Sequence, residues 1–277
     1  MGRAMKSKEM FPGIFSRHAT EYSRRVEQVM ARGESRGRMR LIELAGVRPG
    51  MHVLDMACGP GNLSRLLAQT AAPGGEVVGI DLAAGMIELA RGAAIPNARF
   101  EIMDIENLAF DDGSFDVVTC GHGLQFCPDL PRALRETRRV LRAGGRLVAS
   151  VPIDGMADTA FEVVSDVIDR WLPPRPEVLD QKATRTTLRD TGAFRQAAIE
   201  AGFVSANVEV IEERVTWESA EDFVSMFTGW WVLASRMEGM EPLRRKAFEG
   251  EAVAVLKARH PGTIETIGHN LVLLAEV

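Results

Sequence analysis

Residues 53–63, VLDMACGPGNL, are the stretch of the sequence that decides the fold. The apolar run HVLDMA at 52–57 predicts a buried strand, and NLSRLLAQTA at 62–71 predicts a helix. Between them, Gly59 and Gly61 permit a tight turn and the close approach of a ligand to the backbone. The helix that follows offers unpaired N–H groups at its start. Such a turn is typical of nucleotide-binding α/β folds, but it does not by itself identify the ligand.

The alternation of short β-rich runs and helical patterns continues from residue 51 to residue 150. This alternation is typical of a parallel sheet built from βαβ units. The further expected strands are 76–82, 99–105, 115–124 and 146–152, and the further expected helices are 85–92 and 130–141.

The flanking regions predict an arm and a cap. Residues 15–45 carry apolar and charged residues at helical spacing. Downstream we expect helices at 159–171, 194–201, 220–237 and 243–259, with strands at 204–215 and 270–277. The prediction is a doubly wound, Rossmann-like α/β fold with a seven-stranded sheet. Its parts are a helical arm or lid at 1–45, a core at 46–152, and the remaining strands at 153–277, with a helical substrate cap at about 217–268.

Three acidic residues stand at or near the ends of successive expected strands. Asp55 precedes the glycines, where a carboxylate would repel a pyrophosphate but suits a ligand that carries an ammonium and a sulfonium. Asp81 is placed to accept hydrogen bonds from ribose hydroxyls, and Asp104 lies where an adenine would be. The NAD pattern G-x-G-x-x-G needs a glycine where Ser64 stands. These features favour S-adenosylmethionine (SAM) over NAD.

Four motifs occur in order over about a hundred residues: VLDMACGPGNLS (53–64), VVGIDLAAGMIELAR (77–91), MDIENLAFDDGSFDVVTCGHGLQF (103–126) and RRVLRAGGRLVAS (138–150). Together they resemble class I SAM-dependent methyltransferases, particularly the small-molecule group that includes the ubiquinone and menaquinone C-methyltransferases. The resemblance implies SAM as cofactor and S-adenosylhomocysteine (SAH) as its product.

The resemblance also implies a cofactor site, which would include Asp55 on the grounds given above. Asp81 would bind both ribose hydroxyls, and Asp104 would accept a hydrogen bond from the adenine amino group. The other implied contacts are Ala57, Cys58, Gly59 and Gly61 at the methionine and ribose, Leu82, Met86 and the Ile105 backbone at the adenine, and Gly121 and His122 at the fourth strand.

The candidate catalytic residues are His122, Tyr22 and His18. A base helps methyl transfer when the acceptor is a phenol, a hydroxyl or an acidic carbon, and an imidazole titrates near neutral pH. The alternative for His122 is that it only packs against the cofactor. In related enzymes an aromatic residue of the arm closes over the methionine moiety, so Tyr22 is also an expected cofactor contact; the alternative is amphipathic packing.

An apolar group in the expected cap suggests a substrate pocket for a lipophilic or aromatic molecule, such as a quinone, polyketide or terpenoid. The alternative is the ordinary core of the cap helices. The residues assigned to this pocket are Phe126, Met156, Trp171, Met226, Phe227, Trp230 and Trp231.

The composition and the motifs argue against several functional classes. The net charge of −5 gives no support for a nucleic-acid partner, and Gly121-His122-Gly123-Leu124 stands where amino-methylating nucleic-acid enzymes carry Asn/Asp-Pro-Pro-Tyr/Phe/Trp. No apolar run approaches the roughly 20 residues of a membrane span, and no metal-ligand spacing stands out. Three cysteines without a CxxC pair and the lack of a signal peptide indicate a cytoplasmic protein.

We therefore expect a SAM-dependent methyltransferase that acts on a small, rather apolar acceptor through carbon or oxygen, with a homodimer left open. One alternative is a protein of the same fold, such as a cyclase, that binds SAM without transferring methyl. Others are a methyltransferase of protein or nucleic acid and a NAD oxidoreductase.

Overall fold

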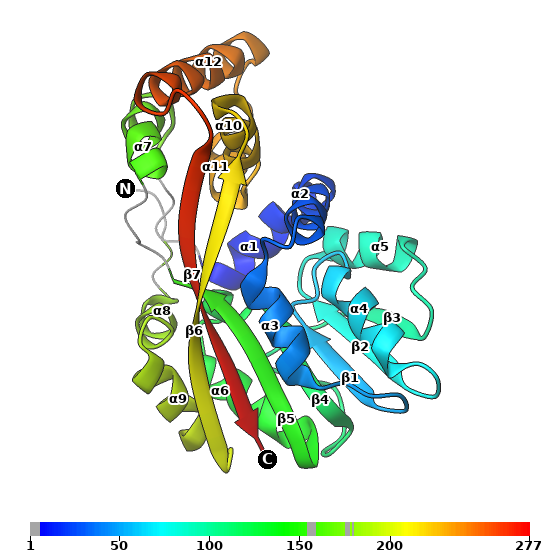
Figure 1. Ribbon diagram of the computed structural model, residues 1–277. Coiled ribbons are helices and arrows are strands. Elements are labelled where there is room, and N and C mark those ends of the chain that lie inside the picture. Colours follow the sequence, from blue (N-terminus) through cyan, green and yellow to red (C-terminus); the bar gives the residue numbers. More distant parts are fainter. Residues whose placement is uncertain (1–5, 154–158, 175–177, 179) are drawn as a thin grey trace.

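The computed structural model describes residues 6–153, 159–174, 178 and 180–277, which form one seven-stranded sheet with helices on both faces (Figure 1). The strands are β1 (His52–Met56), β2 (Glu76–Asp81), β3 (Ala98–Ile102), β4 (Phe115–Gly121), β5 (Leu141–Pro152), β6 (Ser205–Trp217) and β7 (Ile264–Glu276). Their order is β3-β2-β1-β4-β5-β7-β6. β7 is antiparallel to β5 and β6, and the other neighbouring pairs are parallel. The doubly wound, Rossmann-like sheet is confirmed.

Helices cover both faces because successive residues of a strand point to opposite sides. Val53 and Val77 pack with α3 (Arg36–Ala45), α4 (Asn62–Ala71) and α5 (Ala84–Gly92). Their neighbours Leu54 and Val78 pack with α6 (Leu130–Val140) and α9 (Thr191–Glu200) on the other face. These two apolar layers hold the carboxyl ends of the parallel strands at one edge of the molecule.

The cap is built on the two longest strands. Asn270 of β7 pairs with Pro152, the last residue of β5, so the cap-side halves of β6 and β7 continue beyond the sheet core. There they pack with α7 (Thr159–Trp171), α10 (Ala220–Thr228), α11 (Trp231–Arg236) and α12 (Pro242–Arg259) in a separate apolar cluster (Figure 1).

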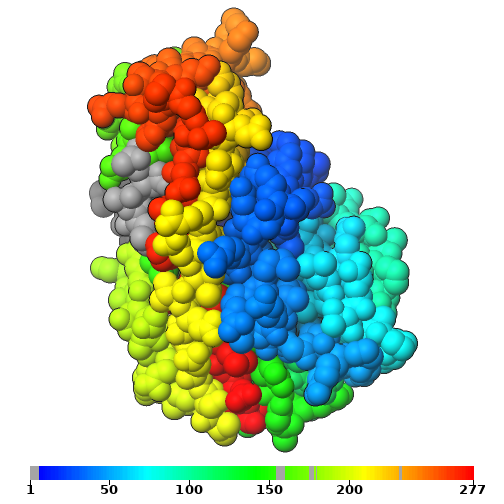
Figure 2. All heavy atoms as spheres, viewed as in Figure 1, coloured from blue at the N-terminus to red at the C-terminus, as the bar shows by residue number. Residues whose placement is uncertain are grey.

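The N-terminal arm consists of α1 (Ser7–Arg17), α2 (Ala19–Ala31) and α3. Figure 2 shows this blue segment lying against both the cyan core and the yellow part of the cap. Since α1 already begins at Ser7, the helical arm starts earlier than the pattern at 15–45 predicts.

Several boundaries differ from the sequence prediction. The helix expected at 220–237 is two helices, because the chain turns at Gly229 and Trp230. β5 and β7 begin earlier than expected, at Leu141 and Ile264, and β4 ends at Gly121 rather than at 124. The short helices α8 (Lys182–Thr187) and η1 (Leu124–Phe126) were not expected.

Candidate functional site

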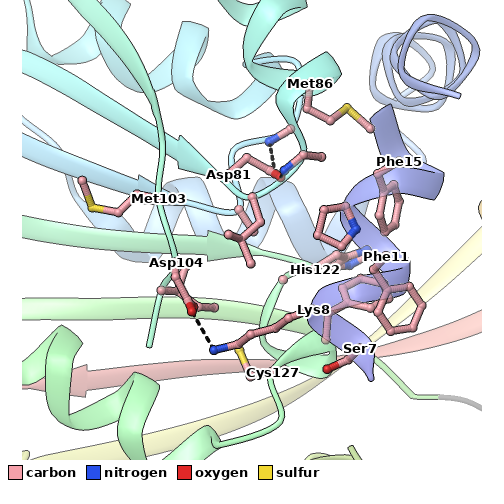
Figure 3. Close-up of a pocket in the computed structure, with 18 of the residues that line it drawn as sticks. Ser7, Lys8, Phe11, Phe15, Asp81, Met86, Met103, Asp104, His122 and Cys127 are labelled. Carbon is pink, nitrogen blue, oxygen red and sulfur yellow. Dashed lines mark hydrogen bonds and ion pairs between the residues drawn. The ribbon is translucent and has the colours of Figure 1, made fainter. Parts of the chain in front are cut away.

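A cavity lies at the carboxyl ends of the first four strands, and α1 lies over it (Figure 3). The residues expected at a cofactor that line it are Tyr22, Ala57, Gly59, Asp81, Leu82, Met86, Asp104, Ile105, Gly121 and His122. Phe126, expected at the substrate, lines it as well. The fold thus brings together side chains from four strand ends and the arm, and their contacts with a ligand stay a prediction.

The loop after β1 forms the floor of the cavity. Ala57 and Gly59 have positive φ angles of 51° and 56°, which turn the chain sharply after the strand. A Cβ atom on Gly59 would lie 4.0 Å from Cε1 of Tyr22, which is van der Waals contact, so the Tyr22 ring of the arm lies over this backbone. The loop and Tyr22 therefore face each other across the floor of the cavity.

Asp81 links this loop to the end of β2. Its Oδ2 accepts a hydrogen bond from the Gly59 amide at 3.0 Å, and its Oδ1 accepts one from the Ala83 amide at 2.8 Å. Burial raises the pKa of Asp81, against the effect of these amides. Each carboxylate oxygen keeps acceptor capacity for a further donor from the cavity.

Three of the expected cofactor residues do not line the cavity: Asp55, Cys58 and Gly61. Asp55 is 1% exposed, and its two oxygens accept hydrogen bonds from the hydroxyls of Ser64 (2.6 Å) and Thr119 (2.8 Å). Burial raises its pKa to about 6. Cys58 is buried, and a side chain on Gly61 would press against Ile95 and Phe100. These contacts give all three residues a structural reason to be where they are.

Lys8, on α1, was missed by the sequence analysis. Its Nζ lies 2.6 Å from Oδ2 of Asp104 and 2.5 Å from Oε2 of Glu106 (Figure 3 draws the first pair). Burial opposes the charge of Lys8, but the two carboxylates outweigh it and raise the pKa of the lysine. Glu106 is 5% exposed and its other oxygen accepts from the Asp129 amide at 2.9 Å. No local pattern pairs a lysine at position 8 with acids 96 and 98 residues away.

Aromatic rings line the arm side of the cavity. The ring of Phe126 lies 4.8 Å from that of Phe11 and 5.3 Å from that of Phe15, centroid to centroid, and both contacts are edge-on. Phe15 also meets Tyr22 at 5.8 Å. Phe11 and Phe15 were not expected at the site, although the apolar run MFPGIF at 10–15 is a signal that could have found them. The cavity wall is therefore largely apolar on this side.

His122 stands at the end of β4 with a positive φ of 61°. Its amide donates to the Ser150 carbonyl at 2.8 Å, and its carbonyl accepts from Nε2 of Gln125 at 2.8 Å. Burial, helped by the charge of Arg38, holds the pKa of the ring well below its usual value. Its surroundings therefore favour the neutral form of the imidazole.

The remaining expected residues lie away from this cavity. His18 Nε2 lies 3.0 Å from Oε1 of Glu238. Met226 and Phe227 pack inside the cap, and Trp171 donates from Nε1 to Glu251 at 2.7 Å. Trp230 is 51% exposed. Met156 and the side chain of Trp231 lie outside the described residues.

Among the residues that the structure describes, no group of three or more His, Cys, Asp or Glu side chains could hold a metal ion. No helix in the same part of the chain is long and apolar enough to cross a membrane.

The core of the chain matches a known protein family and is similar to known proteins. Residues 54–149 match the family described as "Methyltransferase domain". The demethylmenaquinone methyltransferase of Symbiobacterium thermophilum is 37% identical over 141 residues, which cover 49% of this chain and 56% of that protein. The chain thus spans little more than half the length of this relative.

Solved structures share the fold at low sequence identity. The YcgJ protein of Bacillus subtilis has a TM-score of 0.54 and 18% identity, over 87% of this chain and 97% of that one. The Haemonchus contortus phosphoethanolamine N-methyltransferase 2, in complex with S-adenosyl-L-methionine, has a TM-score of 0.52 and 17% identity, over 88% of this chain and 52% of that one. Residues 54–149 are therefore a class I SAM methyltransferase domain that resembles the demethylmenaquinone methyltransferases.

Proposed function

We propose that the chain is a SAM-dependent methyltransferase that methylates a carbon or an oxygen of a small, rather apolar acceptor and releases SAH. One observation carries the proposal. Asp81, Asp104 and Gly59 line the same cavity, at the edge of the sheet where this fold binds its ligands.

The chemistry of the cavity lining supports SAM as the ligand. Gly59 presents backbone without a side chain beneath Tyr22, and Asp81 keeps acceptor capacity that suits ribose hydroxyls. The carboxylates of Asp81, Asp104 and Glu106 outnumber the Lys8 ammonium in the cavity lining, and this net negative charge favours a ligand with a sulfonium and an ammonium. When bound, SAM supplies the activated methyl group; the protein positions the two reactants and excludes water.

An aromatic acceptor is supported by the wall of Phe11, Phe15 and Phe126, since flat apolar molecules pack well against rings. The likeness to demethylmenaquinone methyltransferases favours a quinol or a similar phenol. The side chain of His122 would then accept the proton of the acceptor; a role as cavity wall alone is the alternative.

We extend the proposal to the division of the chain. The arm at 1–45 acts as a lid over the cavity, the core at 46–152 binds SAM, and the cap within 217–268 covers the acceptor. Tyr22 contacts the cofactor, and the cap residues Trp171, Met226, Phe227 and Trp230 lie on the acceptor side.

We also propose that the protein is cytoplasmic and has no nucleic-acid partner. Light scattering after gel filtration distinguishes a monomer from a homodimer.

The first experiment is calorimetric binding of SAH. Asp81→Ala should weaken binding by about 1–3 kcal/mol, or roughly 5–150-fold in Kd, because charge-assisted hydrogen bonds to the ligand are lost. The matched control is Asp111→Ala, which removes an exposed carboxylate from a turn and should leave Kd unchanged. Equal affinity of the wild type and Asp81→Ala would remove the ribose role.

The second experiment is SAH release in the presence of reduced naphthoquinones, phenols and, for comparison, RNA and a protein extract. Release with a phenolic acceptor supports the proposal. Binding of SAM without release by any acceptor would favour a protein that does not transfer methyl, and release only with RNA or protein would overturn the small-molecule acceptor.

A further inference from the structure

A buried asparagine lies beside the cavity on a strand far along the chain. Asn270 is 2% exposed, and it sits where β7 pairs with Pro152 of β5 and with Ile211 of β6. A Cβ atom on Gly37 of α3 would lie 2.9–3.0 Å from Cβ, Cγ and Nδ2 of Asn270. Only a glycine there leaves room for the amide, so the start of α3 and the end of β5 enclose it tightly.

The same region fixes the backbone of His122. Its amide and carbonyl are both hydrogen-bonded, to Ser150 and Gln125, and its φ of 61° is one that non-glycine residues rarely adopt. Backbone of this kind persists where the surroundings over-determine it, and it is concentrated at functional sites. The position of the ring at the cavity is therefore built into the fold.

Among the described residues, four buried side-chain atoms near His122 lack partners: Nε2 of His122 itself, Oδ1 of Asn270, Oγ of Ser150 and Oε1 of Gln125. Within the described residues, neither Nε2 of His122 nor Oδ1 of Asn270 makes a hydrogen bond of good geometry. The Nε2 nitrogen of His122 can donate a hydrogen bond and Oδ1 of Asn270 can only accept one, so a hydrogen bond between them would satisfy both atoms. The Asn270 amide also acts to raise the pKa of the His122 ring, against burial and Arg38. An amide has this effect when its oxygen accepts from a ring N–H, because that bond favours the protonated ring.

We propose that Asn270 is a positioning residue for methyl transfer: its Oδ1 accepts from Nε2–H of His122 and leaves the Nδ1 lone pair free for the acceptor. This rests on the proposed function and on a base role for His122. The hydroxyl proton of the acceptor passes to Nδ1, and the electron pair of the O–H bond supports attack by oxygen or by the conjugated carbon. As the new bond to the methyl carbon forms, the S–CH₃ bond of SAM would break and its electron pair would stay on sulfur. After attack by carbon, the proton on that carbon moves to the ring oxygen and restores the hydroxyl. Asn270 then stabilises the imidazolium, which returns its proton to solvent.

The first test needs no acceptor. Nitrogen-15 NMR of the SAH-bound protein at pH 7.5, with the His122 signals assigned through His122→Gln, reports which ring nitrogen carries the proton. We expect the Nε2–H tautomer in the wild type and a mixture in Asn270→Ala. The pKa of His122 should fall in Asn270→Ala and rise in Asn270→Asp, since a carboxylate stabilises the imidazolium further. The proposal is overturned if the wild type carries the proton on Nδ1, or if the pKa of His122 is the same in the wild type, Asn270→Ala and Asn270→Asp.

The second test uses turnover. Asn270→Ala should lower kcat by roughly 10–100-fold, with the SAH Kd and the acceptor KM within about twofold. The acid limb of kcat should move to lower pH in Asn270→Ala and to higher pH in Asn270→Asp. The matched control is Asn207→Ala, which replaces an exposed asparagine on β6 and should change neither kcat nor its pH profile.

The two variants also separate a structural role from a positioning role. If Asn270→Asp has a lower Tm but the same pH profile of kcat as the wild type, the proposal is overturned. If the wild type binds SAH but methylates nothing, the proposed function fails, whereas the tautomer measurement still decides the contact between Asn270 and His122.

Discussion

At the scale of the residue, Asp55 and Asp81 show how similar positions acquire different chemistry. Both stand at the end of a strand beside the same loop. The oxygens of Asp55 face the hydroxyls of Ser64 and Thr119 in the interior, whereas Asp81 lines the cavity. The sequence assigns both to the cofactor because position along a strand is visible in it. Which side each carboxylate faces depends on neighbours from other elements.

Asp55 should give the protein a pH-dependent stability. Burial raises its pKa in the folded state to about 6, from 3.8 in an unfolded chain. The stability that the protonated form contributes is full below pH 3.8 and is lost as pH rises through about 6, a change on the order of 3 kcal/mol. Asp55→Asn cannot ionise, so its free energy of unfolding relative to the wild type should rise between pH 4 and pH 7. Urea denaturation at several pH values measures this, and a constant difference would contradict it.

At the scale of the element, α1 forms one wall of the cavity. Its aromatic residues Phe11 and Phe15 pack against Phe126, and Lys8 forms ion pairs with Asp104 and Glu106. The helix carries no motif of the core, and only its apolar run hints at a buried face. Its place over the strand ends comes from contacts with residues about a hundred positions away.

Lys8 should help to hold α1 closed. Lys8→Met removes two partly exposed ion pairs and leaves the buried Glu106 carboxylate without its cation, so α1 should open more often. Hydrogen exchange of the α1 amides should be roughly 3–10-fold faster, and 0.5 M salt should accelerate exchange in the wild type more than in the variant. Lys6→Met, a change of the exposed lysine just before α1, is the control. Equal exchange in all three proteins would contradict the role.

At the scale of the whole molecule, the arm joins the core to the cap. The buried guanidinium of Arg25 in α2 hydrogen-bonds the carbonyls of Ser225 (2.7 Å) and Met226 at the end of α10. Arg17 and His18 reach Glu238, just after α11. Because α1 and α2 also line the cavity, the arm connects the cavity to the cap.

Gly229 should be essential to this link. A Cβ atom there would overlap the Arg25 guanidinium, which is held by buried carbonyls and has little freedom to move. Gly229→Ala should therefore lower the free energy of unfolding by about 1–3 kcal/mol, as hydrogen bonds of a buried charge are lost. Gly250→Ala on α12, where a Cβ meets nothing within 4 Å, should be neutral or stabilising. Equal stability of the two variants would show that Arg25 adapts at no cost.

The sequence alone determined the core sheet and predicted the kind of ligand that it binds. Strands and helices between 51 and 150 leave a local periodicity, and the glycine turn with Asp81 and Asp104 lies within about 50 residues of chain. Their meeting at one edge follows from parallel topology, since carboxyl ends of parallel strands lie together. The arm and the cap were visible as helices, but their boundaries and the faces they present were not.

The tertiary structure decided which side chains share a space. It turned Asp55 into the interior, brought Lys8 to Asp104, and enclosed Asn270 beside His122 beneath Gly37. Each of these relations depends on burial and on partners from distant segments, and neither quantity is encoded by local spacing. The loop from Asp55 to Gly61 indicates the cofactor because its geometry is local. The neighbours of His122 become known only when β4, β5, β7 and α3 are packed together.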